Sequence, residues 1–113
     1  PSSEDLIKRY YVDMAFFSTK GLVVGEDTFE SSVATFRLKE IMANQCGQVI
    51  LLADHSKFGQ RALCKVLDMD QINTVVTDDQ APEEDLIRLK KTGIEVYAAA
   101  TRDPLARLEA SSE

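Results

Sequence analysis

The sequence predicts an α/β protein with an open, mainly parallel sheet and helices on both faces. Short apolar runs, several rich in β-branched residues, alternate with amphipathic stretches of helical length, which is typical of such sheets. One run, Val49 to Ala53, breaks directly into Asp, His, Ser and Lys, as a buried strand does when it delivers polar side chains to a loop. The runs expected as strands cover residues 12–18, 49–53, 72–77 and 94–99.

The composition fits one soluble globular domain. The chain has 113 residues, of which 44% are hydrophobic and 28% are charged. No stretch approaches the ~20 apolar residues of a membrane span. Residues 1–5 lack the basic and apolar regions of a signal peptide, and they resemble an internal cut in a longer protein.

Charge and cysteine content exclude two classes of function. The net charge of −6 makes the chain a poor direct binder of DNA or RNA, since phosphate affinity comes from Lys and Arg. Cys46 and Cys64 are isolated and there is one histidine, so a zinc site is improbable and no metal or cofactor is expected. Two unpaired cysteines indicate a reducing compartment, which we take to be the cytoplasm.

The first half of the chain is expected to form two helices and two strands. A short helix capped by Ser2 or Ser3 runs through Tyr10 or Tyr11, and the strand at 12–18 is expected to be buried. Gly21 can supply a positive φ in the turn that follows. A second helix, capped by Asp27 or Thr28, runs to about Asn44, and Gly47 stops it before the strand at 49–53, which is buried on both faces.

The second half is less uniform. Residues 60–67 fit either a strand or a helical turn, and 67–71 fit a turn or a 3₁₀ segment. After the strand at 72–77, Pro82 and the acids at 83–85 begin a helix that ends at Lys91, with Gly93 as its stop. After the strand at 94–99, residues 101–113 are expected to be a flexible tail.

The loops that follow parallel strands share one edge of the sheet, and here they carry many polar groups. Two lysines beside hydroxyls can hold a phosphate, while acids beside them can bind sugar hydroxyls. His55 either contacts that phosphate or points to solvent, and the loop as a whole also fits an ordinary polar surface turn. The three loops are Ser18-Thr19-Lys20, Asp54-His55-Ser56-Lys57 and Thr77-Asp78-Asp79.

Four segments of the chain together resemble the sequence motifs of one known protein family. Residues 13–21 match its D-x-A-F-x-x-x-x-G strand, and residues 52–59 match L-x-D-x-S-K-F-G. Residues 73–78, Asn-Thr-Val-Val-Thr-Asp, are similar to D-T-V-I-T-D, and residues 93–96 are similar to the family's final strand. The matches occur in order from Tyr10 to Ala99, and the family that they resemble is the DeoR family of bacterial transcriptional repressors.

The resemblance implies a sensor domain with a fold like that of ribose-5-phosphate isomerase, which binds phosphorylated sugars or related metabolites. Such a sensor is joined to a winged helix-turn-helix, which this sequence lacks. The early sensor motifs are missing as well, so residues 1–100 are expected to be a partial effector-sensing domain, and a homo-oligomer is expected. The effector-binding candidates are Asp13, Ser18, Thr19, Lys20, Gly21, Asp54, His55, Ser56, Lys57 and Asp78.

Two other functions are compatible with the same residues. A sugar-phosphate isomerase would use Asp13 as a base and Lys57 to hold an oxyanion, although the segment around Lys57 is more similar to regulators. A phosphoacceptor receiver domain would need an acidic pair after the first strand, where Ser18 and Thr19 stand instead. We therefore expect a regulator and not an enzyme.

Overall fold

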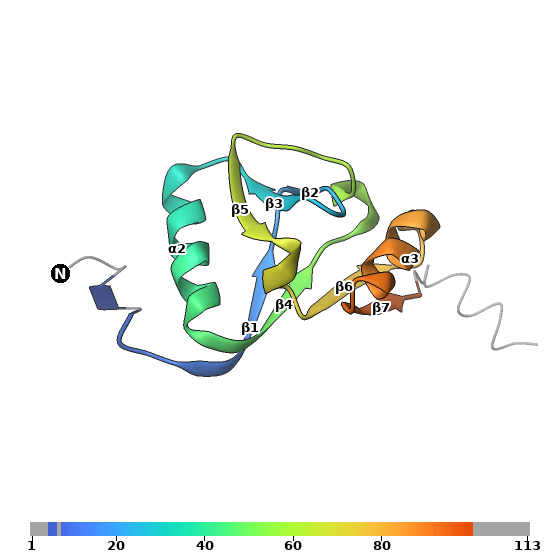
Figure 1. Ribbon diagram of the computed structural model, residues 1–113. Helices are drawn as coiled ribbons and strands as arrows, with labels where there is room; N and C mark the ends of the chain where they lie inside the picture. Colours follow the sequence, from blue (N-terminus) through green and yellow to red (C-terminus); the bar gives the residue numbers. More distant parts are fainter. Residues whose placement is uncertain (1–4, 7, 101–113) are drawn as a thin grey trace, which may run out of the picture.

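The computed structural model describes residues 5, 6 and 8–100, and its centre is a four-stranded parallel sheet (Figure 1). The strands stand in the order β1-β4-β6-β7, and each neighbouring pair is parallel. Their bounds are Val12–Ser18 for β1, Cys46–Leu52 for β4, Thr74–Asp78 for β6 and Glu95–Ala99 for β7. The predicted α/β class with a mainly parallel sheet is therefore confirmed.

A second, antiparallel sheet of three strands was not predicted. It consists of β2 (Gly21–Leu22), β3 (Asp27–Glu30) and β5 (Cys64–Asp68), in the order β2-β3-β5. The expected helix start at Asp27 or Thr28 is wrong, because these residues lie in β3. The Thr28 hydroxyl accepts a hydrogen bond from the Leu67 amide at 3.1 Å, so a partner distant in sequence decides the conformation.

Helix α2 (Val33–Asn44) begins later than the sequence suggested. Its N-cap is Ser32, whose hydroxyl accepts a hydrogen bond from the Thr35 amide at 3.2 Å. The helix ends with Gln45 as its C-cap, and Gly47, expected as the stop, lies inside β4. Phe36 and Ala43, both on the predicted apolar side, pack against the core.

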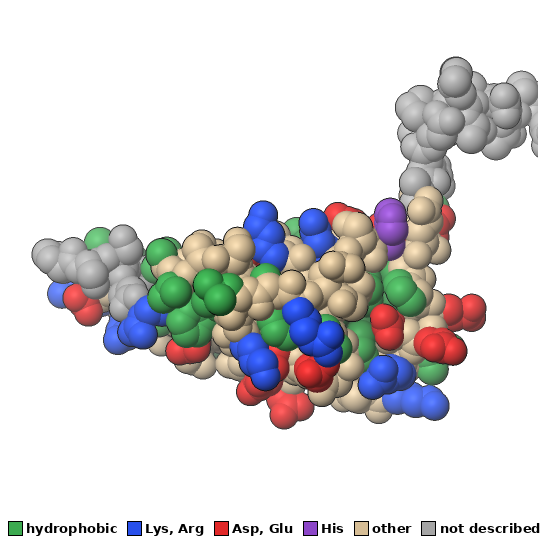
Figure 2. Space-filling model, turned by 90° about the horizontal axis from the view of Figure 1, so that it is seen from above, with side chains coloured by type: hydrophobic (Ala, Val, Ile, Leu, Met, Phe, Trp, Pro, Cys, Tyr) green, Lys and Arg blue, Asp and Glu red, His purple; other side chains and the backbone are tan. Residues whose placement is uncertain are grey.

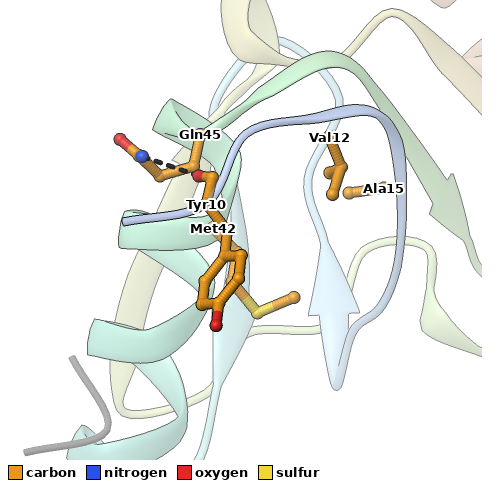
Figure 3. A pocket seen from close by; sticks show the side chains of 5 residues that line it. All are labelled: Tyr10, Val12, Ala15, Met42 and Gln45. Carbon is orange, nitrogen blue, oxygen red and sulfur yellow. Dashed lines mark hydrogen bonds between the residues drawn. The ribbon is translucent and has the colours of Figure 1, made fainter. Parts of the chain in front are cut away.

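Gln45 ties the end of α2 to the segment that leads into β1. Its Nε2 donates to the carbonyl oxygens of Lys8 at 2.9 Å and Tyr10 at 2.8 Å. Figure 3 shows the bond to Tyr10 beside an apolar cavity of about 180 Å³, which is lined by Tyr10, Val12, Ala15, Met42 and Gln45. The segment is therefore held by α2 in a non-helical path.

The first predicted helix is consequently short. Asp5 and Leu6 are helical, but Lys8 and Arg9 form a turn, so the helix does not reach Tyr10 or Tyr11. Its proposed cap at Ser2 or Ser3 and the tail at 101–113 lie outside the described residues.

The remaining elements follow the sequence closely. The 3₁₀ segments η1 (His55–Lys57) and η2 (Met69–Gln71) flank β5, and the strand alternative for 60–67 is confirmed by β5 itself. Helix α3 (Glu83–Lys91) starts after Pro82, with three acids in its first turn. Gly93 has a φ of 91°, the left-handed conformation expected after a helix end.

The core lies on one face of the parallel sheet. A row of side chains from its four strands, Phe17, Leu51, Val75 and Val96, packs there with Leu89 of α3 and with Phe36 of α2. Each connection steps one strand further in the same direction, and right-handed crossovers then all fall on one side. Within the described residues, therefore, the second helical layer predicted from the sequence is not found.

This arrangement also corrects the burial predicted for β1. Ala15 and Phe17 are buried, but Val12, Met14 and Phe16 point to the other face and are about half exposed. The run at 49–51 in β4 is buried on both faces, as expected, while Leu52 is 43% exposed.

On the face shown in Figure 2, basic and acidic side chains are interspersed instead of forming a basic strip. In residues 5, 6 and 8–100, no helix has both the length and the apolar character needed to cross a membrane.

A buried ion pair braces α2 against both sheets. Lys39 Nζ contacts the Glu30 carboxylate in β3 and the carbonyl oxygen of Ser18 at the end of β1. Glu30 is only 5% exposed, so its charge depends on this one lysine for compensation. The sequence analysis did not predict this contact, because Lys39 and Glu30 lie on different elements.

Removing this lysine should destabilise the fold. In Lys39→Met the Glu30 carboxylate would remain buried without its partner, so we expect a loss of about 3 kcal/mol in the free energy of unfolding. Urea denaturation followed by circular dichroism measures it, with the exposed Lys90→Met as a control. Adding Glu30→Gln to Lys39→Met should recover part of the loss, and equal midpoints for Lys39→Met and the wild type would contradict the assignment.

Candidate functional site

The polar loops predicted at the carboxyl edge of the sheet do meet there. β1, β4 and β6 are parallel, so the segments that follow Ser18, Leu52 and Asp78 emerge on the same side. Between the ends of β4 and β6 lies an open cavity of about 360 Å³. Its lining residues are Leu52, Ala53, Asp54, Val76, Thr77 and Asp78.

Asp54 and Ser56 form the start of the loop after β4. Asp54 is the N-cap of η1, and its Oδ1 accepts hydrogen bonds from the Ser56 amide at 2.8 Å and from the Ser56 hydroxyl. The hydroxyl and then the amide stabilise the ionised carboxylate, so the pKa of Asp54 lies below its ordinary value of 3.8. Asp54 is therefore a fixed negative charge at the cavity.

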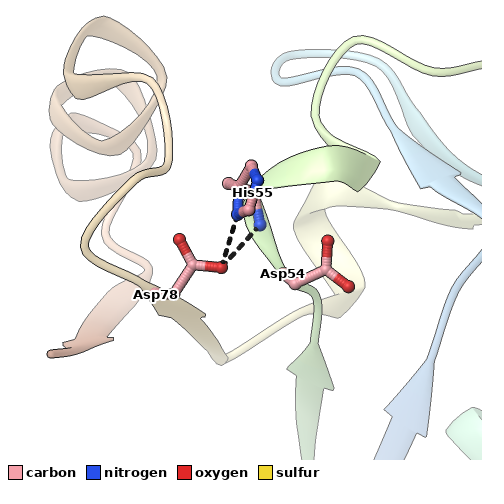
Figure 4. Close-up of side chains that lie close together, drawn as sticks. All are labelled: Asp54, His55 and Asp78. Atoms are coloured by element: carbon pink, nitrogen blue, oxygen red, sulfur yellow. Dashed lines mark hydrogen bonds and ion pairs between the residues drawn. The ribbon is translucent and has the colours of Figure 1, made fainter. Parts of the chain in front are cut away.

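His55 is joined to Asp78 across the gap between β4 and β6 (Figure 4). Asp78 Oδ2 accepts from the His55 amide at 2.9 Å and lies 2.9 Å from His55 Nδ1, while Asp78 Oδ1 accepts from the Gln80 amide at 2.8 Å. The His55 amide is the main cause of a lowered pKa at Asp78. The Asp78 carboxylate in turn raises the pKa of His55 above 6.5, so the imidazole is more easily protonated than usual.

The same three side chains offer a set of ligand atoms that sequence reasoning did not foresee. One atom each from Asp54, His55 and Asp78 lies within 4.8 Å of the others. Two carboxylates and an imidazole suit a divalent cation, but the imidazole Nδ1 faces Asp78 Oδ2, and a cation would have to displace that contact. The sequence analysis considered metal binding from the spacing of the cysteines. It could not have identified this group, because Asp78 approaches Asp54 and His55 only when β6 pairs with β4.

Lys57 is the last residue of η1, and the backbone that follows it is fixed by packing and by a hydrogen bond. Phe58 is buried, and the Gly59 amide donates to the Leu22 carbonyl oxygen at 2.8 Å, which fixes the loop against β2. Lys57 is half-buried, and among residues 5, 6 and 8–100 it forms no ion pair. A lysine with a fixed base and a free ammonium group can receive an anion.

Thr77 contributes an unusual polar group beside the cavity. It is 5% exposed, and its Oγ1 is the one buried side-chain oxygen or nitrogen without a hydrogen-bond partner in the described part of the chain. A buried hydroxyl without a hydrogen-bond partner lowers the stability of the folded state unless another group supplies a hydrogen bond. The sequence placed Thr77 at this edge but gave no sign that its hydroxyl is unpaired.

Most groups of the loop after β1 stabilise the fold and do not face the cavity. The Thr19 hydroxyl is buried and donates to the carbonyl oxygens of Gly21 at 2.8 Å and Phe29 at 3.0 Å. A Cβ on Gly21 would stand 2.2 Å from the Gln60 carbonyl oxygen, so close backbone packing requires glycine there. Lys20 alone of this loop presents an exposed charged side chain, while the Ser18 carbonyl oxygen is used by Lys39.

Asp13 is not brought to this edge. It lies near the start of β1, beside the pair Val12 and Cys46, and five residues before Ser18. At about 3.3 Å per residue this separation is roughly 17 Å. The structure therefore brings together Asp54, His55, Ser56 and Asp78. It places Lys57 in the same loop and Lys20 on the same edge of the sheet, and it leaves Asp13 apart.

Comparison with known proteins gives this edge a context. The family model described as the DeoR C terminal sensor domain matches residues 1–79, more than half of the chain. The chain belongs to the DeoR sensor-domain family. The resemblance seen in the sequence is thus confirmed, and the family is one of regulator domains and not of enzymes.

Several DeoR-type regulators are similar to most of this chain. The transcriptional regulator GlpR of Haloferax volcanii is 26% identical over 90% of the chain and 40% of its own length. The putative aga operon repressor of Escherichia coli O157:H7 is 27% identical over 83% of the chain and 35% of its length. The L-fucose operon activator of Haemophilus influenzae is 31% identical over 74% and 33%, so the chain spans about a third to two-fifths of these relatives.

The protonation of His55 provides a direct test of the site's geometry. Because the chain contains one histidine, its ring resonance can be followed by NMR as the pH changes. We expect a pKa above 6.5 that falls in Asp78→Asn, with Asp70→Asn, whose carboxylate lies in η2, as the control. A pKa unaffected by Asp78→Asn would contradict the contact.

The sign of the accompanying stability change follows from the same shift. His55 binds its proton more tightly in the folded state, so the protonated pair stabilises the fold below pH 6.5. That contribution is lost as the pH rises through the folded-state pKa. Asp78 behaves oppositely, since its lowered pKa gives stability above pH 3.8 that is lost on further acidification.

Proposed function

We propose that this chain is the effector-binding part of a DeoR-type transcriptional regulator that senses a phosphorylated sugar or a related metabolite. Binding would modulate how a helix-turn-helix domain outside this chain holds DNA. The observation that carries the proposal is a cavity lined by Asp54 and Asp78, with His55 bound to Asp78 and Lys57 in the same short loop, in a member of a sensor-domain family.

The side chains divide naturally between the two ends of such a ligand. Lys57, supported by Lys20 and by protonated His55, supplies positive charge and hydrogen-bond donors for a phosphate. Asp54 and Asp78 each keep acceptor capacity for sugar hydroxyls beyond the hydrogen bonds that they accept from the loop. Net charge alone would repel a phosphate from two carboxylates, so the cations at this edge are essential to the proposal.

The other predicted residues take secondary parts. Ser56 orients Asp54 through its hydroxyl, and Thr19 and Gly21 shape the turn that carries Ser18 and Lys20. Asp13 has no part in the proposed site, because it lies at the far end of β1.

The names of the relatives support a role in carbohydrate metabolism. One of them is named as an activator of the L-fucose operon, and L-fucose is a sugar. We extend this to the present chain as part of the proposal, together with a cytoplasmic location and a homo-oligomeric regulator. Residues 1–100 would form part of the sensor domain and 101–113 a tail.

Calorimetric titration of the intact regulator with a panel of sugar phosphates tests the proposal. We expect saturable binding of at least one compound, weakened roughly ten- to hundredfold in Lys57→Ala, the range for loss of one charge-assisted hydrogen bond. Lys91→Ala, which removes an exposed lysine from the end of α3, is the matched control. It should leave the affinity unchanged.

Two results would contradict the proposal at different levels. Binding that is equally strong in Lys57→Ala would move the phosphate contact away from this loop. An absence of binding by every compound in the panel would contradict the sugar-phosphate effector itself.

A further inference from the structure

Asp54, His55 and Asp78 form a compact set of side chains at the carboxyl edge of the sheet, here called the carboxylate-histidine group (Figure 4). One ligand atom from each lies within 4.8 Å of the others, and Asp78 Oδ2 lies 2.9 Å from His55 Nδ1. Two ligands that are each about 2.1 Å from one cation stand roughly 3.0 Å apart when adjacent and roughly 4.2 Å apart when opposite. The spacing of the group is therefore close to that of ligands around one ion, and a small rotation of the imidazole ring would aim Nδ1 at it.

Backbone amides hold both carboxylates in place, as hydrogen bonds commonly do for carboxylates that bind metals. Asp54 Oδ1 accepts from the amide and the hydroxyl of Ser56, and Asp78 accepts from the amides of His55 and Gln80. These bonds leave Asp54 Oδ2 available to a further partner. The side chains of His55 and Asp78 are 48% and 21% exposed, so an ion can reach the group from solvent.

The group carries more negative charge than the protein neutralises. In the described part of the chain, neither Asp54 nor Asp78 forms an ion pair with a lysine or an arginine, and Asp78 is paired only with His55. One imidazolium can compensate at most one of the two carboxylates. A divalent cation between them would neutralise both and remove their mutual repulsion.

The adjoining cavity lacks positive charge as well. Asp54 and Asp78 are the ionisable residues in its lining, which contains neither lysine nor arginine. Thr77 also lines it, and its buried hydroxyl, which has no hydrogen-bond partner among the described residues, is a group that a bound ligand can satisfy. A hydroxyl alone cannot hold a phosphate against two carboxylates. A phosphorylated ligand in this cavity therefore requires a cation between itself and the two acids.

The types of ligand indicate which ion fits the group. Carboxylate oxygens suit Mg²⁺, Ca²⁺ and Mn²⁺, whereas imidazole nitrogen suits transition-metal ions such as Zn²⁺, Fe²⁺ and Ni²⁺. Mn²⁺ belongs to the first set and is also a transition-metal ion, so it matches a mixture of the two ligand types. Three protein ligands leave coordination positions open, and water or a phosphate oxygen can occupy them.

We propose that Asp54, His55 and Asp78 bind a divalent transition-metal ion of the Mn²⁺ type, and that the open positions of this ion receive the phosphate of the effector. His55 coordinates through a neutral Nδ1. Any proton on Nδ1 passes to solvent, and the cation takes its place beside Asp78 Oδ2. The metal site itself needs no effector, whereas the contact with phosphate rests on the proposed function.

Titration of the metal-free intact regulator with MnCl₂, without effector, tests the metal site. Electron paramagnetic resonance measures the free Mn²⁺. We expect Asp54→Asn and Asp78→Asn each to weaken binding roughly tenfold or more, because each removes a charged ligand. Asp79→Asn removes the same charge from the neighbouring residue outside the group, and it should leave the affinity within about twofold of the wild type.

The same titration of His55→Ala gives an independent result at an exposed side chain, with circular dichroism to verify the fold of every variant. Mn²⁺ sites elsewhere in the regulator remain in all the variants, so a difference from the wild type belongs to this group. Equal affinities in the wild type and the three variants Asp54→Asn, His55→Ala and Asp78→Asn would overturn the metal site. An equal loss in Asp79→Asn would overturn it too, since general electrostatic attraction would then account for binding.

Calorimetry with the panel of sugar phosphates, in the presence of Mn²⁺ and separately of EDTA, tests the contact with phosphate. We expect at least one compound to bind roughly tenfold or more tightly with Mn²⁺, and we expect His55→Ala to lose this gain. Equal affinity under the two conditions would overturn the bridging role of the ion and leave the sensing proposal intact. If no compound binds under either condition, the sensing proposal and the bridge both fail, while the MnCl₂ titration still decides the metal site.

Discussion

The burial of one row of side chains, Phe17, Leu51, Val75 and Val96, is the constraint on which the rest of the structure depends. These residues come from four parallel strands, and they can share one core only if the strands are in register. That register in turn brings the carboxyl ends of β1, β4 and β6 to one edge. The candidate site therefore exists because the hydrophobic core aligns segments that are far apart in the sequence.

The site at this edge is held by backbone groups more than by side-chain packing. Asp54 accepts from the Ser56 amide and Asp78 accepts from the His55 and Gln80 amides, so both carboxylates are fixed while one face of the site stays open. Lys57 differs, since its backbone is anchored next to buried Phe58 while its ammonium group has no ion-pair partner among the described residues. Fixed acids and a free cation are an arrangement that suits recognition of a ligand carrying both hydroxyls and a negative charge.

Because the connections between the parallel strands all step in one direction, helices cover only one face of the parallel sheet in the described residues. Helices α2 and α3 and the second sheet all pack on that face. Leu22, Leu67 and Leu89 are almost completely buried there. The face of the parallel sheet opposite the helices keeps several exposed apolar side chains, among them Phe16, Leu52 and Tyr97.

Local sequence was sufficient for the parts of this protein that depend on neighbouring residues. The strands near Val49 and Val75, helix α3 between its acidic first turn and Gly93, and the loop from Asp54 to Lys57 all follow from composition and spacing. It also identified the DeoR family, because the motif residues of these segments occur in a fixed order. These features are encoded within a few residues of one another.

Tertiary structure decided the rest, because it depends on partners that are distant in the chain. Residues 27–30 form a strand through their pairing with β5, Lys39 turns inward to meet Glu30, and Asp13 is separated from Lys57 by the length of β1. Likewise, the contact between His55 and Asp78 requires β4 and β6 to be neighbours. Periodicity reports which side chains share a face, but only the order of strands and the hand of their connections determine which face is covered and which residues meet.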